Sequence, residues 1–365
     1  MKSIFRALLF VIFFGAAGDL AAAPTAVELG FIATLSGPRA SLGRDALDGA
    51  NLALSEVNAQ SPVPIKLQVE DSQGDPKTGI SAYKKLLRDG RHFILTQNSN
   101  VSLPISQLVN NDQVLQLARC TTADAYSSAH DLTFRVNGST YNEAQKIAQA
   151  VKEKYAAGPA AVGIVTMEDE YPEMLRKNLA GLLKNQDIPV AFSDSFAPKE
   201  NDFRSVISKL KQRKISILAF LSYPTEAGTF ARQFSEQQPG AITIVFNTAV
   251  NAPEYFAAAG EAADGKYLAA LAVELNSPAA RAFQRRYNRA PSWMAASGYD
   301  AVKIANQALG QCAFKIDLSC LSKALYGIKH YDGLSGTKGF DDVFGDMSDV
   351  YKLVLSKGGK FVDTD

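Results

Sequence analysis

The sequence predicts an α/β protein made of two units, each a parallel sheet covered by helices on both faces. Short apolar runs alternate with segments of helical periodicity, and the alternation begins again near Tyr141. The chain has 365 residues, enough for about two domains. Apolar residues make up 47% of it and charged residues 21%, which is typical of a packed globular protein and excludes a disordered chain.

The first unit opens with a buried-strand run and an amphipathic helix. In that helix Leu47, Ala50, Leu54 and Val57 recur at spacings of three and four, so they share one face. Pro76 lies near the first turn of the next helix, a common helix start. The expected strands are Val27–Leu35, Ile65–Asp71, Phe93–Gln97 and Val114–Ala118, and the expected helices are Arg44–Asn58, Lys77–Arg88 and Leu103–Asn110.

The second unit repeats this order. Its helix over Asp202–Lys211 has Phe203, Val206, Ile207 and Leu210 on one face. The expected strands are Ala161–Thr166, Val190–Ser193, Ile215–Leu221, Ile242–Phe246 and Tyr267–Leu271, and the other helices are Tyr141–Tyr155, Pro172–Leu183 and Thr225–Ser235.

The last part of the chain does not continue this alternation of strands and helices. Three helices follow one another, and a glycine-rich stretch over Gly333–Gly345 precedes a final strand over Val350–Leu355. Helices without intervening strands build no third sheet, so we expect them to pack onto one of the two units. The three helices are Ser277–Tyr287, Trp293–Leu309 and Asp317–Leu325.

The amino terminus has the layout of a secretory signal peptide. Lys2 and Arg6 precede an apolar run from Ala7 to Ala17, and small residues follow. That run is too short to span a bilayer comfortably, although a buried helix or a membrane anchor is the alternative. We expect residues 1–23 to be removed near Ala22, leaving an exported chain of roughly 340 residues.

If the chain is exported, its three cysteines can form disulfides. An oxidising compartment permits a local disulfide between Cys312 and Cys320, and two unpaired buried thiols are the alternative. Cys120 is left over. There is no CxxC, so zinc-ribbon and thioredoxin-like sites have no support.

Several function classes are excluded or disfavoured. The formal charge of +1 argues against a nucleic-acid partner. No nucleophile elbow, Walker A, HExxH or dinucleotide fingerprint occurs, and His92, His130 and His330 are isolated. We therefore expect no enzyme, cofactor or metal, and a secreted enzyme is a remote alternative. An exported two-unit α/β protein without catalytic motifs suggests a ligand-binding protein, because ligands sit beyond the carboxyl ends of parallel strands.

Four stretches resemble the periplasmic substrate-binding proteins of ABC transporters, of the leucine/isoleucine/valine-binding type. They are Gly30-x4-Leu35-Ser36-Gly37-Pro38, Asp48-Gly49-Ala50 through Asn58 with Asp71 to Pro76 after it, Tyr223-Pro224-Thr225-Glu226-Ala227-Gly228, and Ser297-Gly298-Tyr299-Asp300-Ala301. The resemblance implies two Rossmann-like lobes joined by a three-strand hinge, the type I periplasmic binding fold. Lobe 1 would be 24–136 plus 271–348, and lobe 2 would be 137–270 plus 349–365.

The resemblance also implies site residues. Ser99 stands where the family holds a ligand carboxylate, with Asn98 beside it, and Cys120 and Thr122 stand where a carbonyl and a hydroxyl hold the polar head of the ligand. Tyr171 and Tyr223 match tyrosines that close over the ligand. For Ser99 and Thr122, capping of strand ends is the alternative, and for the tyrosines an aromatic lobe surface.

Three positions depart from the family's amino-acid binders. Thr248 stands where they carry a buried carboxylate for the ligand ammonium, and Leu42 replaces an aromatic residue. Arg119 adds a cation near the site, unless it points to the surface. Because a threonine cannot neutralise a buried ammonium, these changes favour an organic or aromatic acid, or an amide, over an amino acid.

We therefore expect a monomeric periplasmic protein that captures a small polar ligand and delivers it to an inner-membrane ABC permease. A periplasmic sensor that passes ligand occupancy to a membrane signalling protein is the alternative.

Overall fold

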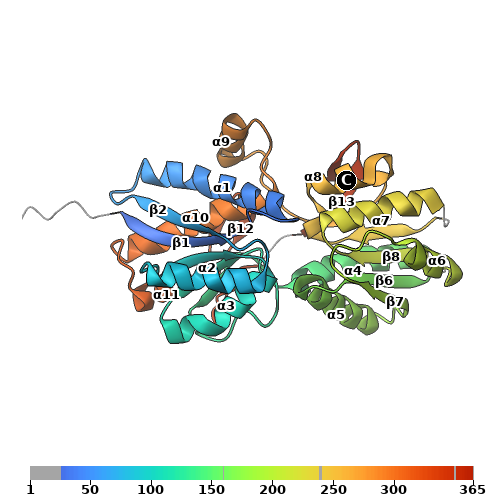
Figure 1. The fold of residues 1–365 in the computed structure, drawn as a ribbon, viewed down its shortest axis with the longest axis horizontal. Coiled ribbons are helices and arrows are strands. Elements are labelled where there is room, and N and C mark those ends of the chain that lie inside the picture. Colours follow the sequence, from blue (N-terminus) through green and yellow to red (C-terminus); the bar gives the residue numbers. More distant parts are fainter. Residues whose placement is uncertain (1–25, 159, 238–240, 349–350, 365) are drawn as a thin grey trace, which may run out of the picture.

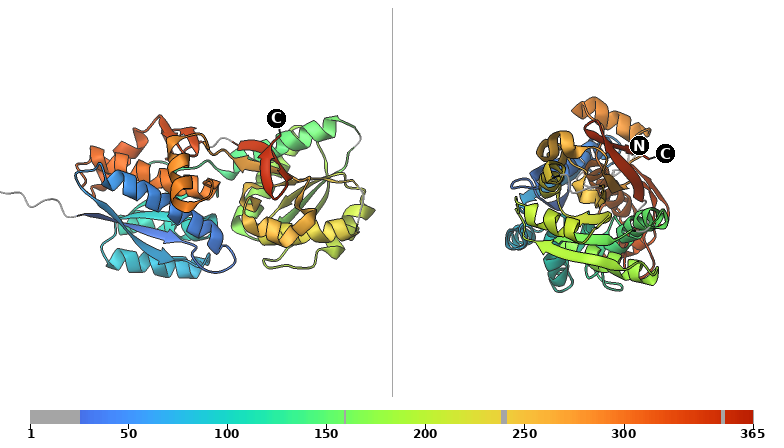
Figure 2. Two further views of the ribbon diagram at one scale, coloured as in Figure 1. Left: turned by 90° about the horizontal axis from the view of Figure 1, so that it is seen from above. Right: turned by 90° about the vertical axis from the view of Figure 1, so that its right-hand side faces the viewer.

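The computed structural model describes residues 26–158, 160–237, 241–348 and 351–364, which form two α/β lobes side by side (Figure 1, Figure 2). The expected fold class is confirmed, since each lobe has a sheet of parallel strands flanked by helices. The expected signal peptide over residues 1–23 lies outside the described residues. Within the described part of the chain, no helix is long and apolar enough to cross a membrane.

The first lobe is built on a five-stranded sheet in the order β2-β1-β3-β4-β5, and every neighbouring pair is parallel. The shortest strand, β5, was not expected, because three residues give no periodicity to detect. The strands are β1 (Val27–Ala33), β2 (Ile65–Asp71), β3 (Phe93–Gln97), β4 (Leu115–Arg119) and β5 (Thr133–Arg135).

Helices cover both faces of this sheet. The helices α1 (Ala40–Asn58) and α10 (Trp293–Gln311) lie on one face, and α2 (Pro76–Arg88) and α3 (Ser99–Asp112) lie on the other (Figure 1). A Cβ added to Gly49 would lie 1.9 Å from the carbonyl oxygen of Ala295, and one added to Gly298 would lie 2.0 Å from that of Ala46. The backbones of α1 and α10 therefore touch at these glycines, which belong to the family-like stretches.

The late segments pack against the first sheet with α10. These segments are α9 (Pro278–Tyr287), α11 (Leu318–Tyr326) and a hairpin of β11 (Tyr331–Gly333) and β12 (Gly336–Lys338). This hairpin was not expected from the sequence. Asp300 of α10 is buried and accepts hydrogen bonds from the Tyr331 hydroxyl at 3.0 Å and the Leu334 amide at 2.8 Å. Cys312 and Cys320 form a disulfide that joins the end of α10 to α11.

The second lobe has a seven-stranded sheet in the order β14-β13-β10-β9-β8-β6-β7. The β10–β13 and β13–β14 pairs are antiparallel, and the other neighbouring pairs are parallel. The strands are β6 (Val162–Met167), β7 (Val190–Phe196), β8 (Ile217–Leu221), β9 (Thr243–Phe246), β10 (Tyr267–Leu271), β13 (Tyr351–Lys357) and β14 (Lys360–Asp363). The helices are α4 (Thr140–Ala156), α5 (Glu170–Asn185), α6 (Arg204–Gln212), α7 (Pro224–Gln237) and α8 (Pro253–Ala259), with single 3₁₀ turns η1 (Thr248–Val250) and η2 (Gly260–Ala263). Strand β14 and helix α8 were not expected.

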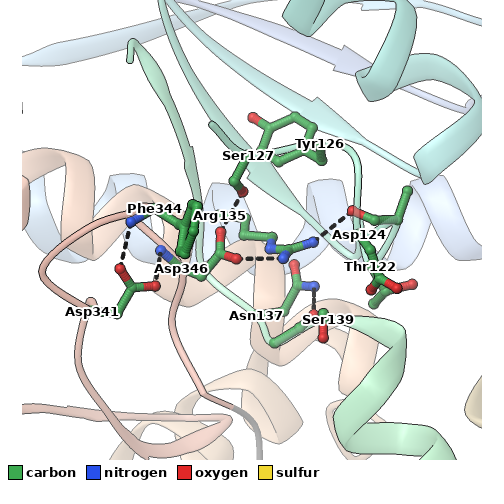
Figure 3. Close-up of polar contacts among 12 residues, drawn as sticks. Thr122, Asp124, Tyr126, Ser127, Arg135, Asn137, Ser139, Asp341, Phe344 and Asp346 are labelled. Atoms are coloured by element: carbon green, nitrogen blue, oxygen red, sulfur yellow. Dashed lines mark hydrogen bonds and ion pairs between the residues drawn. The ribbon is translucent and has the colours of Figure 1, made fainter. Parts of the chain in front are cut away.

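The chain crosses between the two sheets three times: after β5, after β10 and before β13. A buried ion pair joins Arg135, just before the first crossing, to Asp346, just before the third (Figure 3). Ser127 donates a hydrogen bond of 2.5 Å to the same carboxylate. This pair links the segments that precede two of the crossings.

Candidate functional site

A cavity lies between the two lobes. First-lobe loops that follow β3 and β4, second-lobe loops and all three crossings contribute to its wall. The residues that line it are Leu42, Asn98, Ser99, Cys120, Thr122, Asn137, Tyr171, Tyr223, Thr248, Ala249, Leu271, Trp293 and Tyr351. The cavity thus lies beyond the carboxyl ends of β3, β4 and β8, where open α/β sheets bind ligands.

One end of the cavity is built from Ser99, the first residue of α3. Its Oγ accepts hydrogen bonds from the backbone N–H groups of Thr122 at 3.1 Å and Ala123 at 3.2 Å. A hydroxyl oxygen has two lone pairs, and both are engaged, so the hydroxyl proton is free to point elsewhere. The adjoining helix N-terminus presents further N–H groups with partial positive charge. This end of the cavity suits an anionic oxygen.

The Thr122 side chain lies at the same end. Its Oγ1 is buried and has no hydrogen-bond partner among the residues that the structure describes. Cys120 has a φ of 52°, a conformation that most residues avoid, and its thiol donates to Ser297 Oγ at 3.3 Å. Asn98 has a φ of 66° and donates from Nδ2 to Thr34 Oγ1 at 3.0 Å. Strained backbone at two adjoining strand ends is typical of a binding site.

The second lobe supplies two tyrosines, whose ring centroids lie 6.2 Å apart. Tyr171 donates from its hydroxyl to Glu143 at 2.8 Å. Burial raises the pKa of Tyr171 well above its ordinary value, and the Glu143 charge adds to the effect. Burial likewise raises the pKa of Tyr223, against the opposing charge of Arg39. Both phenols therefore stay neutral.

Sequence reasoning missed Glu143, which lies behind this wall on α4. Its side chain is fully buried and accepts from the Thr248 backbone N–H at 2.6 Å as well as from Tyr171. Thr248 Oγ1 in turn accepts from the backbone N–H of Leu271 at 3.0 Å. Glu143 thus holds Tyr171 and the Thr248 backbone in place from behind, and it is not among the residues that line the cavity.

The apolar wall also contains an unexpected residue, Trp293 at the start of α10. It packs in one cluster with Leu42 and with Ala252 of the second lobe, and its Nε1 donates to the Asn251 carbonyl oxygen at 3.2 Å. An aromatic ring therefore reaches the neighbourhood of Leu42 from another helix. The one tryptophan of the chain was the available signal. Asn137, Ala249, Leu271 and Tyr351 were also missed, since the hinge crossings and η1 offer no motif.

Eight of the nine residues expected at the site line this cavity, and Arg119 does not. The alternative, that Arg119 points to the surface, is excluded, because its side chain is fully buried one residue before Cys120. The alternation of side chains along β4 and the covering helices place it inside the lobe.

The described residues that line the cavity carry no formal charge. Among the lining residues that the structure describes, none is an aspartate, glutamate, lysine or arginine. The described ranges also contain no group of three metal-ligating side chains close enough to hold an ion. The chemistry of the cavity is therefore that of neutral donors at one end and aromatic and aliphatic surface elsewhere.

A family model described as periplasmic binding protein matches residues 26–360, which span both lobes and all three crossings. The chain belongs to the periplasmic binding protein family. This periplasmic binding protein is 25% identical over 355 residues to a Leu/Ile/Val-binding protein of Rhizobium johnstonii, covering 94% of this chain and 96% of the relative.

Solved structures share its fold. A branched-chain amino acid transporter substrate binding protein from Streptococcus pneumoniae, in complex with isoleucine, has a TM-score of 0.82 at 20% identity and covers 92% of this chain and 98% of its own. A solute binding protein of an ABC transporter from R. palustris, in complex with benzoate, has a TM-score of 0.82 at 18% identity and covers 93% and 95%. This periplasmic binding protein therefore resembles proteins solved with an amino acid and with an aromatic acid alike.

Proposed function

We propose that this protein is the solute-binding component of an ABC importer and that its ligand is a small organic carboxylate without an ammonium group. The observation that carries the proposal is the chemistry of the cavity. Hydroxyl and helix N-terminal donors gather at one end, and none of the described residues that line the rest is a carboxylate.

The donors account for the carboxylate. Ser99 has a free hydroxyl proton, since its oxygen already accepts two N–H groups, and Thr122 Oγ1 is buried without a partner. Hydrogen bonds from such groups to an ionised oxygen are about twice as strong as those between neutral groups. A carboxylate placed here would satisfy Thr122 and use the dipole of α3.

The rest of the wall accounts for the missing ammonium. An ammonium buried in this cavity would face Leu42, Trp293, the two tyrosines and Thr248. Glu143 is nearby but accepts from Tyr171 and from the Thr248 backbone. An uncompensated buried charge is strongly unfavourable, so an amino acid should bind less well than the same acid without its amino group.

The comparisons agree with either ligand class. Benzoate, bound by the R. palustris protein, has a carboxylate and no ammonium, whereas isoleucine, bound by the S. pneumoniae protein, has both. We infer that this chain belongs with the acid binders.

The transport role rests on the family and on the two-lobe architecture. We propose that lobe 1 (24–136 plus 271–348) and lobe 2 (137–270 plus 349–365) close on the ligand in the periplasm. The monomer would then deliver its ligand to an inner-membrane permease. No observation favours the sensor alternative.

A thermal-shift screen tests the ligand class. We expect isocaproate, which is leucine without its amino group, and benzoate to raise the unfolding temperature more than leucine or isocaproamide does. A ligand at about 100 times its dissociation constant should add about 2.7 kcal/mol to the free energy of unfolding. Stabilisation by leucine alone would contradict the proposal.

A further inference from the structure

Arg119 is a buried cation directly beneath the cavity. It ends β4, its side chain is fully buried, and the next residue, Cys120, lines the cavity. Its Nη2 donates to Gln97 Oε1 at 2.7 Å, and its Cζ lies 4.8 Å from the centroid of the Phe31 ring. Gln97 in turn ends β3, two residues before Ser99. The guanidinium therefore sits below the strand ends that carry the polar end of the cavity.

This cation has no carboxylate partner, unlike the other buried bases that the structure describes. Arg135 pairs with Asp346 (Figure 3), and Lys338 Nζ lies 4.0 Å from Asp300 Oδ2. In Arg119, by contrast, Nε and Nη1 are buried without an oxygen or nitrogen acceptor. Burial lowers the pKa of Arg119 to about 10, so it is still charged at neutral pH.

We infer that Arg119 is the buried counter-charge for the ligand carboxylate and determines the preference of the cavity for anions. The inference rests on the proposed function, since it concerns the same cavity. A charge in a low-dielectric interior acts beyond its contacts, because little water is present to screen it. Ser99 and Thr122 follow the ends of β3 and β4, above this charge. An anion that they hold would therefore neutralise the Arg119 guanidinium. Arg119 needs no contact with the ligand to do this.

The Cys120 thiol is the competing counter-charge. Burial lowers the pKa of Arg119, and the Cys120 side chain raises it in part, through its charge and a hydrogen bond. A thiolate there would neutralise the guanidinium in the empty protein. The charge of Arg119 would then no longer favour a ligand carboxylate. The two arrangements make opposite predictions for ligands that differ only in charge.

The test measures calorimetric affinities for isocaproate and for its amide in the wild type, Arg119→Met and Cys120→Ser. We expect Arg119→Met to lose at least tenfold in affinity for the acid and less than threefold for the amide. Cys120→Ser alters a residue that lines the cavity, so we expect both affinities to change, but by the same factor, because neither thiol nor hydroxyl brings a charge. Methionine fills a similar volume without charge, so the empty variant should unfold at or above the wild-type temperature, which shows that it folds.

Three results would overturn the inference. An unchanged ratio of acid to amide affinity in folded Arg119→Met would show that Arg119 does not determine the preference of the cavity for anions. A thiolate absorbance in the empty wild type that vanishes in Arg119→Met would assign the counter-charge to Cys120. If the wild type binds neither the acid nor the amide, the proposed function fails and this inference falls with it.

Discussion

Arg39 of the first lobe and Asp169 of the second form an ion pair between the lobes, with Nη2 and Oδ2 2.5 Å apart. The Arg39 guanidinium also stacks 3.6 Å above the ring of Tyr223. The two residues immediately precede helices α1 and α5, and only 15% and 11% of their side-chain surfaces are exposed. Because both side chains are largely buried, removing one partner would leave the other charge desolvated and unpaired, which costs more than breaking an exposed pair. It joins the lobes directly and so favours the closed arrangement.

Removing this contact should speed ligand release. Arg39→Met keeps the apolar stem but leaves Asp169 unpaired, and we expect it to weaken isocaproate binding by about 1–2 kcal/mol, which is about tenfold. The loss should appear in the dissociation rate, measured by stopped-flow fluorescence of Trp293. Arg204→Met is the matched control, because its pair with Asp202 is exposed on the second lobe. Equal release rates in Arg39→Met and the wild type would show that the contact does not hold the lobes together.

The Ser99 hydroxyl should matter for both binding and folding. Ser99→Ala removes a donor to the ligand carboxylate, and we expect affinity to fall about tenfold or more. It also leaves the Thr122 and Ala123 N–H groups without their acceptor, which should cost about 1–3 kcal/mol of unfolding free energy. Ser106→Ala on the same helix, which removes a bond to the Leu103 carbonyl and a long one from Gln107 Nε2, is the control. Calorimetry and urea unfolding measure the two effects, and a Ser99→Ala variant with wild-type affinity would refute the carboxylate subsite.

Much of this site could be predicted from the sequence, because loops after parallel strands converge at one edge. Ser99 and Thr122 are brought together by the parallel pairing of β3 and β4, which strand-like apolar runs predict. Trp293 and Glu143 could not be placed, because their positions depend on how α10 and α4 pack, which spacing alone does not give. The position of the Arg119 side chain was left open for the same reason: a basic residue at a strand end is exposed or buried according to which helix covers it.

A carboxylate restored at position 248 should change the ligand class. In Thr248→Glu, a ligand ammonium would gain a partner, so we expect leucine affinity to rise by about tenfold or more and isocaproate affinity to fall. Thr248→Gln is the matched variant, since it has the same size without the charge. If leucine binds Glu and Gln variants equally, the charge at this position does not select the ligand.

The disulfide should stabilise the fold without affecting binding. It closes a loop of eight residues, and replacing both Cys312 and Cys320 by serine should cost about 2–3 kcal/mol of unfolding free energy. It lies at the far end of the 19-residue helix α10 from Trp293, about 28 Å along the axis. Isocaproate affinity should therefore stay within about twofold of the wild type, with urea unfolding and calorimetry as readouts. A large loss of affinity would show that the disulfide sets the position of α10 at the cavity.

The central claim is that the cavity takes a carboxylate and has no partner for an ammonium. Isothermal titration of the wild type with isocaproate and with leucine tests it most directly, because the two ligands differ only in the amino group. We predict that isocaproate binds at least about tenfold more tightly, since burying an unpaired ammonium is unfavourable. Leucine binding as tight as isocaproate, or tighter, would contradict the account.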